Sequence, residues 1–89
     1  MRNELTIVTV SYSFDAEVVA LIFNSYEEAC DYIKADFEEE KRIDIEESGY
    51  EIDEEMTYCE ESMAVLATCY RNGTETTTWT VARVIDKRN

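Results

Sequence analysis

Carboxylates that could act together are concentrated in one stretch of the chain. Sixteen of the twenty-one acidic residues lie between residues 27 and 61, where the only basic residues are Lys34, Lys41 and Arg42. The rest of the chain holds five acids and five bases, so the formal net charge of −13 belongs to this stretch. Like charges at such density repel one another and destabilise the compact state. We therefore expect the stretch to serve a function, most simply contact with a positively charged partner.

The spacing of these carboxylates suits a partner that normally binds nucleic acid. A helix over residues 25–48 would be about 36 Å long at about 1.5 Å per residue. It would hold ten acids, which is about half the charge density of duplex DNA, with its one charge per about 1.7 Å. The predicted partner-binding residues are Asp36, Glu38, Glu39, Glu40, Asp44, Glu46, Glu47, Asp53, Glu54 and Glu55, with Tyr50 and Tyr58 beside them. The alternative is an acidic helix face that is only solvated.

Metal binding and catalysis find less support in the residues. Asp44, Ser48, Gly49 and Glu55 stand at positions 1, 5, 6 and 12 of a calcium-binding loop. A Glu replaces the usual apolar residue at position 8, and Gly49 is explained more simply as the end of a helix. There is no His to act as a base near neutral pH. We expect no cofactor and no enzymatic activity.

The three cysteines do not suggest a catalytic, metal or disulfide site. Their number is odd, and no Cys-x-x-Cys pair occurs. Cys30 lies on the apolar face of the predicted helix and is expected in the core. Cys59 lies among acids, which would raise the pKa of its thiol and make it a poor nucleophile. Free thiols, an N-terminus unlike a signal peptide, and no apolar run of about 20 residues favour a cytoplasmic location.

The elements that must position the acids follow from hydrophobic periodicity. Residues 5–14 and 17–23 predict an antiparallel hairpin in which Thr6, Val8, Val10, Tyr12 and Phe14 share one face. Ser25 and Glu28 form a capping box, and apolar residues continue at helical spacing to Phe37, so a helix is expected over 25–41. The longer alternative ends at Ser48, with Gly49 as its stop.

The C-terminal half of the chain predicts more strands. Residues 50–62 alternate loosely and favour an exposed edge strand. Residues 63–71 and 74–85 predict two strands joined at Asn72-Gly73, with Trp79 and Val81 on one face and Ala82 and Val84 on the other. The order β-β-α-β-β-β predicts an α+β fold. Residues 1–89 would form one domain, a single antiparallel sheet with one long acidic helix packed on one face.

The chain resembles the small acidic anti-defence proteins of phages and mobile elements, including anti-CRISPR and anti-restriction proteins that mimic DNA. The resemblance lies in size, acidity, lack of a cofactor motif and the compact α+β pattern. It implies a stoichiometric inhibitor, a monomer or small homo-oligomer, that blocks the basic groove of a nuclease such as a CRISPR effector. An immunity or antitoxin protein that neutralises a basic toxin would use the same electrostatics. Direct binding to nucleic acid or to anionic lipid is disfavoured because both would repel the acids.

Overall fold

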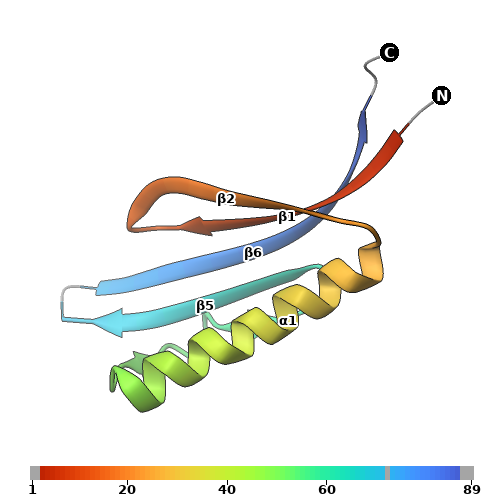
Figure 1. Ribbon diagram of the computed structural model, residues 1–89. Coiled ribbons are helices and arrows are strands. Elements are labelled where there is room, and N and C mark those ends of the chain that lie inside the picture. Colours follow the sequence, from red (N-terminus) through yellow and green to blue (C-terminus); the bar gives the residue numbers. More distant parts are fainter. Residues whose placement is uncertain (1–2, 72, 87–89) are drawn as a thin grey trace.

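An antiparallel sheet of six strands, with one long helix on one face, makes up the computed structural model of residues 3–71 and 73–86 (Figure 1). The predicted α+β arrangement is therefore confirmed. The sheet order is β2-β1-β6-β5-β3, and β4 also pairs with β5. The elements are β1 (Asn3–Tyr12), β2 (Asp15–Phe23), α1 (Tyr26–Arg42), a π-helix η1 (Ile43–Glu47), β3 (Glu51–Ile52), β4 (Tyr58–Cys59), β5 (Met63–Tyr70) and β6 (Gly73–Asp86).

The first hairpin joins β1 to β2, as the alternating pattern predicts. Thr6 lies opposite Phe23 and Thr9 opposite Ala20, and the register shifts between Ser11 and Tyr12. The turn follows Tyr12, so the prediction that Phe14 shares the face of Val8 is wrong. Phe14 lies in the turn, where its ring contacts Tyr12 and remains 57% exposed. Strand β2 is an edge strand, and most of its residues are exposed.

The helix begins and ends where its sequence signals indicate. The Ser25 hydroxyl accepts a hydrogen bond from the backbone N–H of Glu28 at 3.1 Å, which satisfies one free N–H group of the first turn. Helix α1 continues into η1, and the helical stretch ends at Ser48. Gly49 follows with a φ of 69°, a left-handed conformation that glycine adopts without a steric penalty. The predicted extension to Ser48 is therefore confirmed.

The segment between η1 and β5 is not one edge strand, as residues 50–62 suggested. It forms two strands of two residues each, β3 and β4, which both pair with β5. Between them, the Asp53 carboxylate accepts hydrogen bonds from the backbone N–H groups of Glu55 and Met56. This side-chain-to-backbone bonding competes with strand pairing and turns the chain away from the sheet.

The second hairpin, β5 to β6, has Tyr70 opposite Gly73. Its connection therefore falls one residue earlier than the Asn72-Gly73 pattern suggested, and Asn72 itself lies outside the described residues. Gly73 has a φ of 144°, which suits glycine. Strand β6 is central in the sheet and pairs with both β1 and β5.

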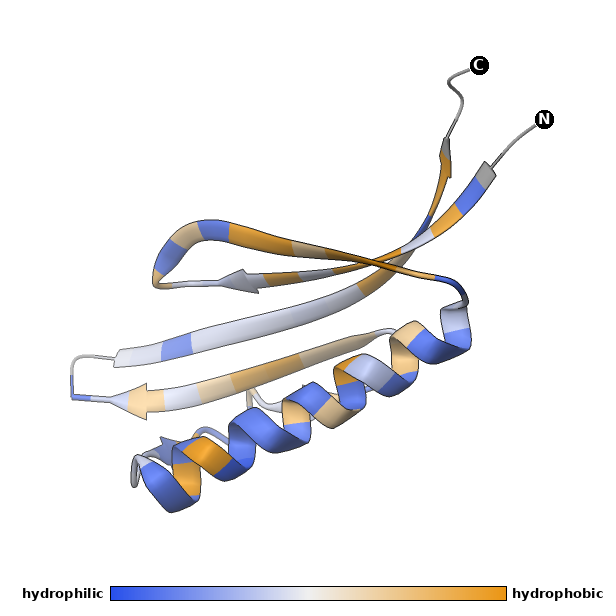
Figure 2. Cartoon of the chain, viewed as in Figure 1, coloured by the Kyte–Doolittle hydropathy of each residue, from blue (hydrophilic) through white to orange (hydrophobic). Residues whose placement is uncertain are grey.

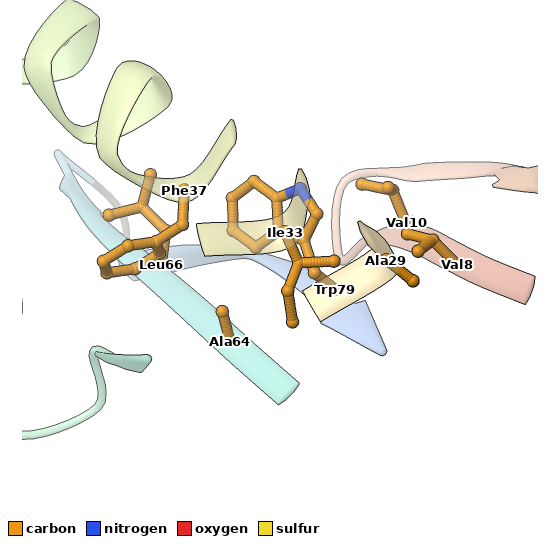
Figure 3. Packing of buried hydrophobic residues seen from close by; sticks show 8 residues of the cluster. All are labelled: Val8, Val10, Ala29, Ile33, Phe37, Ala64, Leu66 and Trp79. Atoms are coloured by element: carbon orange, nitrogen blue, oxygen red, sulfur yellow. The ribbon is translucent and has the colours of Figure 1, made fainter. Parts of the chain in front are cut away.

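The core lies between α1 and the centre of the sheet. Ile33 and Phe37 pack from the helix against Trp79 of β6, which is completely buried (Figure 3). The Phe37 and Trp79 rings meet edge to face with centroids 5.9 Å apart, a favoured aromatic geometry. Val8 and Val10 of β1 and Ala64 and Leu66 of β5 complete the cluster. As expected, Trp79 and Val81 face the helix, whereas Ala82 and Val84 are exposed on the other side.

Helix α1 lies over β5, β6 and β1 and only touches β2 (Figure 1). Hydrophilic residues dominate its outer surface, whereas the longest apolar run of the first hairpin lies on β2 (Figure 2). Within the described residues, no helix is both long enough and apolar enough to cross a membrane.

Candidate functional site

An acidic groove lies between α1 and the segment that follows β4. Side chains of α1 between Tyr26 and Glu38 form one wall, and the chain from Cys59 to Glu61 forms the other. The groove has a volume of about 730 Å³. It is lined by Tyr26, Glu27, Cys30, Asp31, Lys34, Glu38, Cys59, Glu60 and Glu61.

The groove strongly favours a cationic occupant. Five of its lining side chains are carboxylates and one, Lys34, is an ammonium group. Walls of low dielectric concentrate the field of such charges, so a groove of one sign attracts ligands of the opposite sign. The geometry can hold an Arg or Lys side chain, with its apolar stem against Tyr26 and its charged group among the carboxylates.

The two thiols in the groove are not placed as the sequence suggested. Cys30 was expected in the core but is only half-buried, because it lies at the edge of the apolar stripe and lines the groove. Burial raises the pKa of its thiol, and Glu61 and Asp31 raise it further. Cys59 is exposed, and its pKa is also raised, by partial desolvation and by the nearby Glu38. Both thiols are therefore mostly protonated near neutral pH, which makes them poor nucleophiles and metal ligands.

Three of the predicted contact residues are already engaged by Arg42. Its guanidinium binds both carboxylate oxygens of Glu39, at 2.7 and 3.1 Å, and reaches Glu46 and Glu47 at 3.3 Å. These bonds lower the pKa of Glu39 and raise that of Arg42. We call Arg42, Glu39, Glu46 and Glu47 the Arg42 cluster. Its three carboxylates share one cation, so it offers a partner less negative charge than the acid count suggests.

Asp36 and Asp44, which were predicted to contact a partner, do not lie on the outer side of the helix. The Asp36 carboxylate accepts a hydrogen bond from the indole N–H of Trp79 at 2.8 Å. The Asp44 carboxylate accepts one from the hydroxyl of Thr68, a buried residue of β5, also at 2.8 Å. Both acids are half-buried between helix and sheet, because a buried N–H or O–H group needs an acceptor.

The remaining predicted residues lie on or beside β3, β4 and the turn between them. Asp53 is half-buried and stabilises its own turn, on which Glu54 and Glu55 are exposed. The Tyr50 ring packs on Tyr70 with centroids 4.8 Å apart. The Tyr58 hydroxyl donates to the sulfur of Met63. Both tyrosines remain about 40% exposed, so a partner could contact them, but neither lines the acidic groove.

No family model, curated protein or solved structure matches this chain. The site must therefore be judged from its own geometry. Of the predicted contact residues, only Glu38 lines the acidic groove. The sequence reasoning missed Glu27, Asp31, Glu60 and Glu61 as groove residues. The i, i+4 spacing of Glu27 and Asp31 signals a shared helix face, but nothing in the sequence shows that the chain after β4 returns to it.

The segment proposed as a calcium loop does not have a loop conformation. Residues 43–47 form η1, and the carboxylate expected at its first ligand position, that of Asp44, is bonded to Thr68. Among the described residues, no group of three or more acidic or cysteine side chains is placed to hold a metal ion.

Repulsion among the helix acids should make stability depend on pH. Glu40 has a raised pKa, first because of desolvation and then because Asp36, Asp44 and Glu39 repel its charge. An acid whose pKa is raised by folding opposes folding when ionised, and protonation relieves this. The melting temperature should therefore rise as the pH falls from about 7 towards about 5. Below about pH 4.5 it should fall again, because Glu39, whose pKa is lowered, loses its bond to Arg42.

Thermal unfolding at fixed protein concentration checks this expectation. Raising the salt from roughly 20 mM to roughly 500 mM at pH 7 should also raise the melting temperature, because salt screens exposed charges. Glu40→Gln should raise the melting temperature at pH 7 and weaken its rise on acidification, whereas Glu17→Gln, at an exposed acid of β2, should change neither. A melting temperature that falls steadily from pH 7 to pH 5 would contradict the prediction.

Proposed function

We propose that this protein is a stoichiometric inhibitor that mimics nucleic acid and occupies the basic nucleic-acid groove of a nuclease, such as a CRISPR effector. The observation that carries the proposal is the acidic groove, whose lining side chains include five carboxylates and a single ammonium group. Such a surface attracts Arg and Lys side chains that would otherwise bind phosphates. The interaction would take place in the cytoplasm.

The helical stretch supports the same proposal through its length. Residues 26–47 form 17 residues of α1 and five of η1, which span about 33 Å at about 1.5 Å per residue. This is close to one turn of B-DNA at about 34 Å. Glu27, Glu28, Asp31, Glu38 and Glu40 are exposed along this length. The exposed carboxylates from Glu27 to Glu40 extend over about 20 Å of this length, at about 1.5 Å per residue.

Within this surface, the acidic groove should contribute more binding energy than the Arg42 cluster. Carboxylates of the cluster must give up bonds to Arg42 before they can bind a partner, which reduces their net gain. The groove acids form no ion pair within the described residues. We therefore assign the principal contacts to Glu27, Asp31, Glu38, Glu60 and Glu61, with Glu54, Glu55, Tyr50 and Tyr58 as contacts at the edge.

Capture of partners from a cell lysate at two salt concentrations tests this function. The immobilised protein should retain a basic nucleic-acid-binding protein at roughly 50 mM salt and release most of it at roughly 500 mM, because exposed charges are screened. Added duplex DNA should compete for that protein. If the retained protein is a basic toxin whose active site does not bind nucleic acid, the chain is instead an immunity or antitoxin protein. Retention that salt and DNA leave unchanged would refute an electrostatic mimic.

A further inference from the structure

The face of the sheet opposite α1 carries no helix among the described residues and is mostly apolar. Tyr58 reaches over Met63 at its edge, and Ala67 on this face is completely buried. We call this face the open face and define it by the side chains that the strand register places there. On β1 and β2 these are Leu5, Ile7, Thr9, Ser11, Val18, Ala20 and Ile22; on β6 and β5 they are Thr76, Thr78, Thr80, Ala82, Val84, Met63 and Val65. None of these side chains carries a charge at neutral pH. Val18 is 61% exposed and Ile22 70% exposed, although both are strand residues in an apolar run.

The arrangement of charge on the molecule identifies what can cover this face. The nearest cation on β6, Arg83, points to the helix side, where it lies 4.2 Å from the centre of the Tyr26 ring. The acids of α1 also lie on the helix side. A charged partner would therefore bind the helix side, whereas the open face offers only apolar and hydroxyl groups, with the one carboxylate of Glu51 on β3 beyond its β5 edge. A second copy of this chain presents the same uncharged apolar face and matches it.

The repulsion between two chains of net charge −13 does not prevent this association. Two sheets packed face to face lie about 10 Å apart. Each helix lies on the far side of its own sheet, so the two acidic surfaces are separated by more than two Debye lengths of about 8 Å. Pairing of two copies helix to helix or helix to sheet would instead bring an acidic surface close to the partner.

The open face has a sizeable area. Its residues span five positions of β2, seven of β1, nine of β6 and three of β5, a projected area of roughly 400 Å² at about 4.8 Å between strands and about 3.4 Å per residue. The accessible area of a face with protruding side chains is larger, and specific interfaces bury about 800 Å² per partner. Large and small side chains alternate along β2 at Val18, Ala20 and Ile22. Ala82 and Val84 of β6 likewise differ in size, and Ala82 lies opposite Ile7 of β1. Such a face can interdigitate with its symmetry mate.

We propose that two copies of this chain form a symmetric dimer through the open face. The dimer has four layers, helix, sheet, sheet and helix, and its two acidic grooves face outward on opposite sides. One dimer could therefore bind two basic partners. The interface is of the self-complementary two-fold kind, in which the same residues of both copies meet.

Sedimentation equilibrium of the full chain tests the proposal. The expected mass is twice the chain mass of 10.4 kDa at tens of micromolar protein and roughly 150 mM salt. Ile22→Lys should weaken the dimer at least about 100-fold, because it puts an unpaired charge in an apolar interface. Its far-UV circular dichroism should match that of the wild type, since Ile22 is exposed in the monomer. If Ile22→Lys does not fold, the double variant Val18→Thr/Ile22→Thr, which keeps β-branched side chains, should weaken the dimer about 10-fold.

Val19→Lys is the matched control. Val19 lies on the same strand, is 40% exposed and pairs with Val10 on the helix side, so it is outside the proposed interface. The dimer should survive this change. If Val19→Lys dissociates the dimer and Ile22→Lys does not, the copies pair through another surface, such as the free edge of β2, and the proposal is refuted. A monomeric wild type at tens of micromolar would refute it outright.

Discussion

Replacement of Trp79 by alanine should lower the free energy of unfolding by about 3–5 kcal/mol, the range for aromatic residues in well-packed cores. Trp79 is completely buried and is the largest side chain of the cluster between helix and sheet. Its removal leaves a cavity beneath Phe37 and deprives the Asp36 carboxylate of its hydrogen-bond donor. Domains are stable by only about 5–15 kcal/mol, so the variant should be partly unfolded at 37 °C.

Urea unfolding followed by far-UV circular dichroism measures this loss, because the variant lacks the only tryptophan. Ile85→Ala, at a 44% exposed position of the same strand, is the control and should cost less than about 1 kcal/mol. An unfolding midpoint for Trp79→Ala as close to the wild type as that of Ile85→Ala would show that the indole is not central to the core.

The bond between Asp36 and Trp79 can be separated from the packing of the ring. Asp36→Ala leaves a buried indole N–H without its acceptor and should cost about 1–3 kcal/mol. Asp36→Asn keeps an acceptor oxygen and should cost less. If Asp36 instead acted mainly on a partner, Asp36→Asn would reduce partner binding and Asp36→Ala would leave stability unchanged. The structure instead predicts that Asp36→Ala lowers stability and that Asp36→Asn leaves partner binding unchanged.

Charge reversal in the acidic groove should abolish most partner binding without unfolding the chain. In the double variant Glu38→Lys/Glu60→Lys, two attractions to the partner become repulsions. The expected loss is about 2–4 kcal/mol, equivalent to about 30- to 800-fold in affinity. Both side chains are exposed, so the unfolding midpoint should stay the same or rise, because the acidic surface repels itself less.

The control for this variant must change net charge equally. Glu17→Lys/Glu51→Lys does so at two exposed residues that do not line the groove. It should retain most of the affinity for the partner captured by the wild type, measured by calorimetry at one salt concentration. Equal losses in both variants would mean that net charge, and not the groove, drives binding. Glu39 is unsuitable for this comparison, because its reversal would also break the bidentate bond to Arg42.

Local signals explain why the elements could be predicted. The Ser25 hydroxyl and the apolar positions of α1 act within one or two helical turns, and the alternation in β1, β5 and β6 acts within each strand. The Asp53 side chain bonds to the backbone N–H groups of Glu55 and Met56, and this bonding overrode the weak alternation of residues 50–62, so that two short strands formed. The predicted position of Phe14 was wrong because the chain turns after Tyr12, so that Phe14 is no longer part of β1.

The site was less predictable than the fold. Periodicity indicates only approximately which face of the helical stretch an acid occupies. Asp36 and Asp44 stand at the boundary between the outer face and the face that packs on the sheet. Their role depends on Trp79 and Thr68, which lie 43 and 24 residues further along the chain. In the same way, the acidic groove exists only because β4 pairs with β5 and brings Glu60 and Glu61 beside Glu38.

Charge and periodicity are properties of neighbouring residues, so the gathering of acids on one helix and the turn after it, supported by an apolar sheet, follows from the order of residues alone. Which acids are available to a partner depends on contacts between distant parts of the fold. The tertiary structure assigned Asp36 and Asp44 to buried donors, tied Glu39 to Arg42, and assembled a groove from two distant segments. It also put α1 on one face of the sheet and left most of the opposite face open. A single helix can cover only one face, and which face it covers is settled by packing between elements.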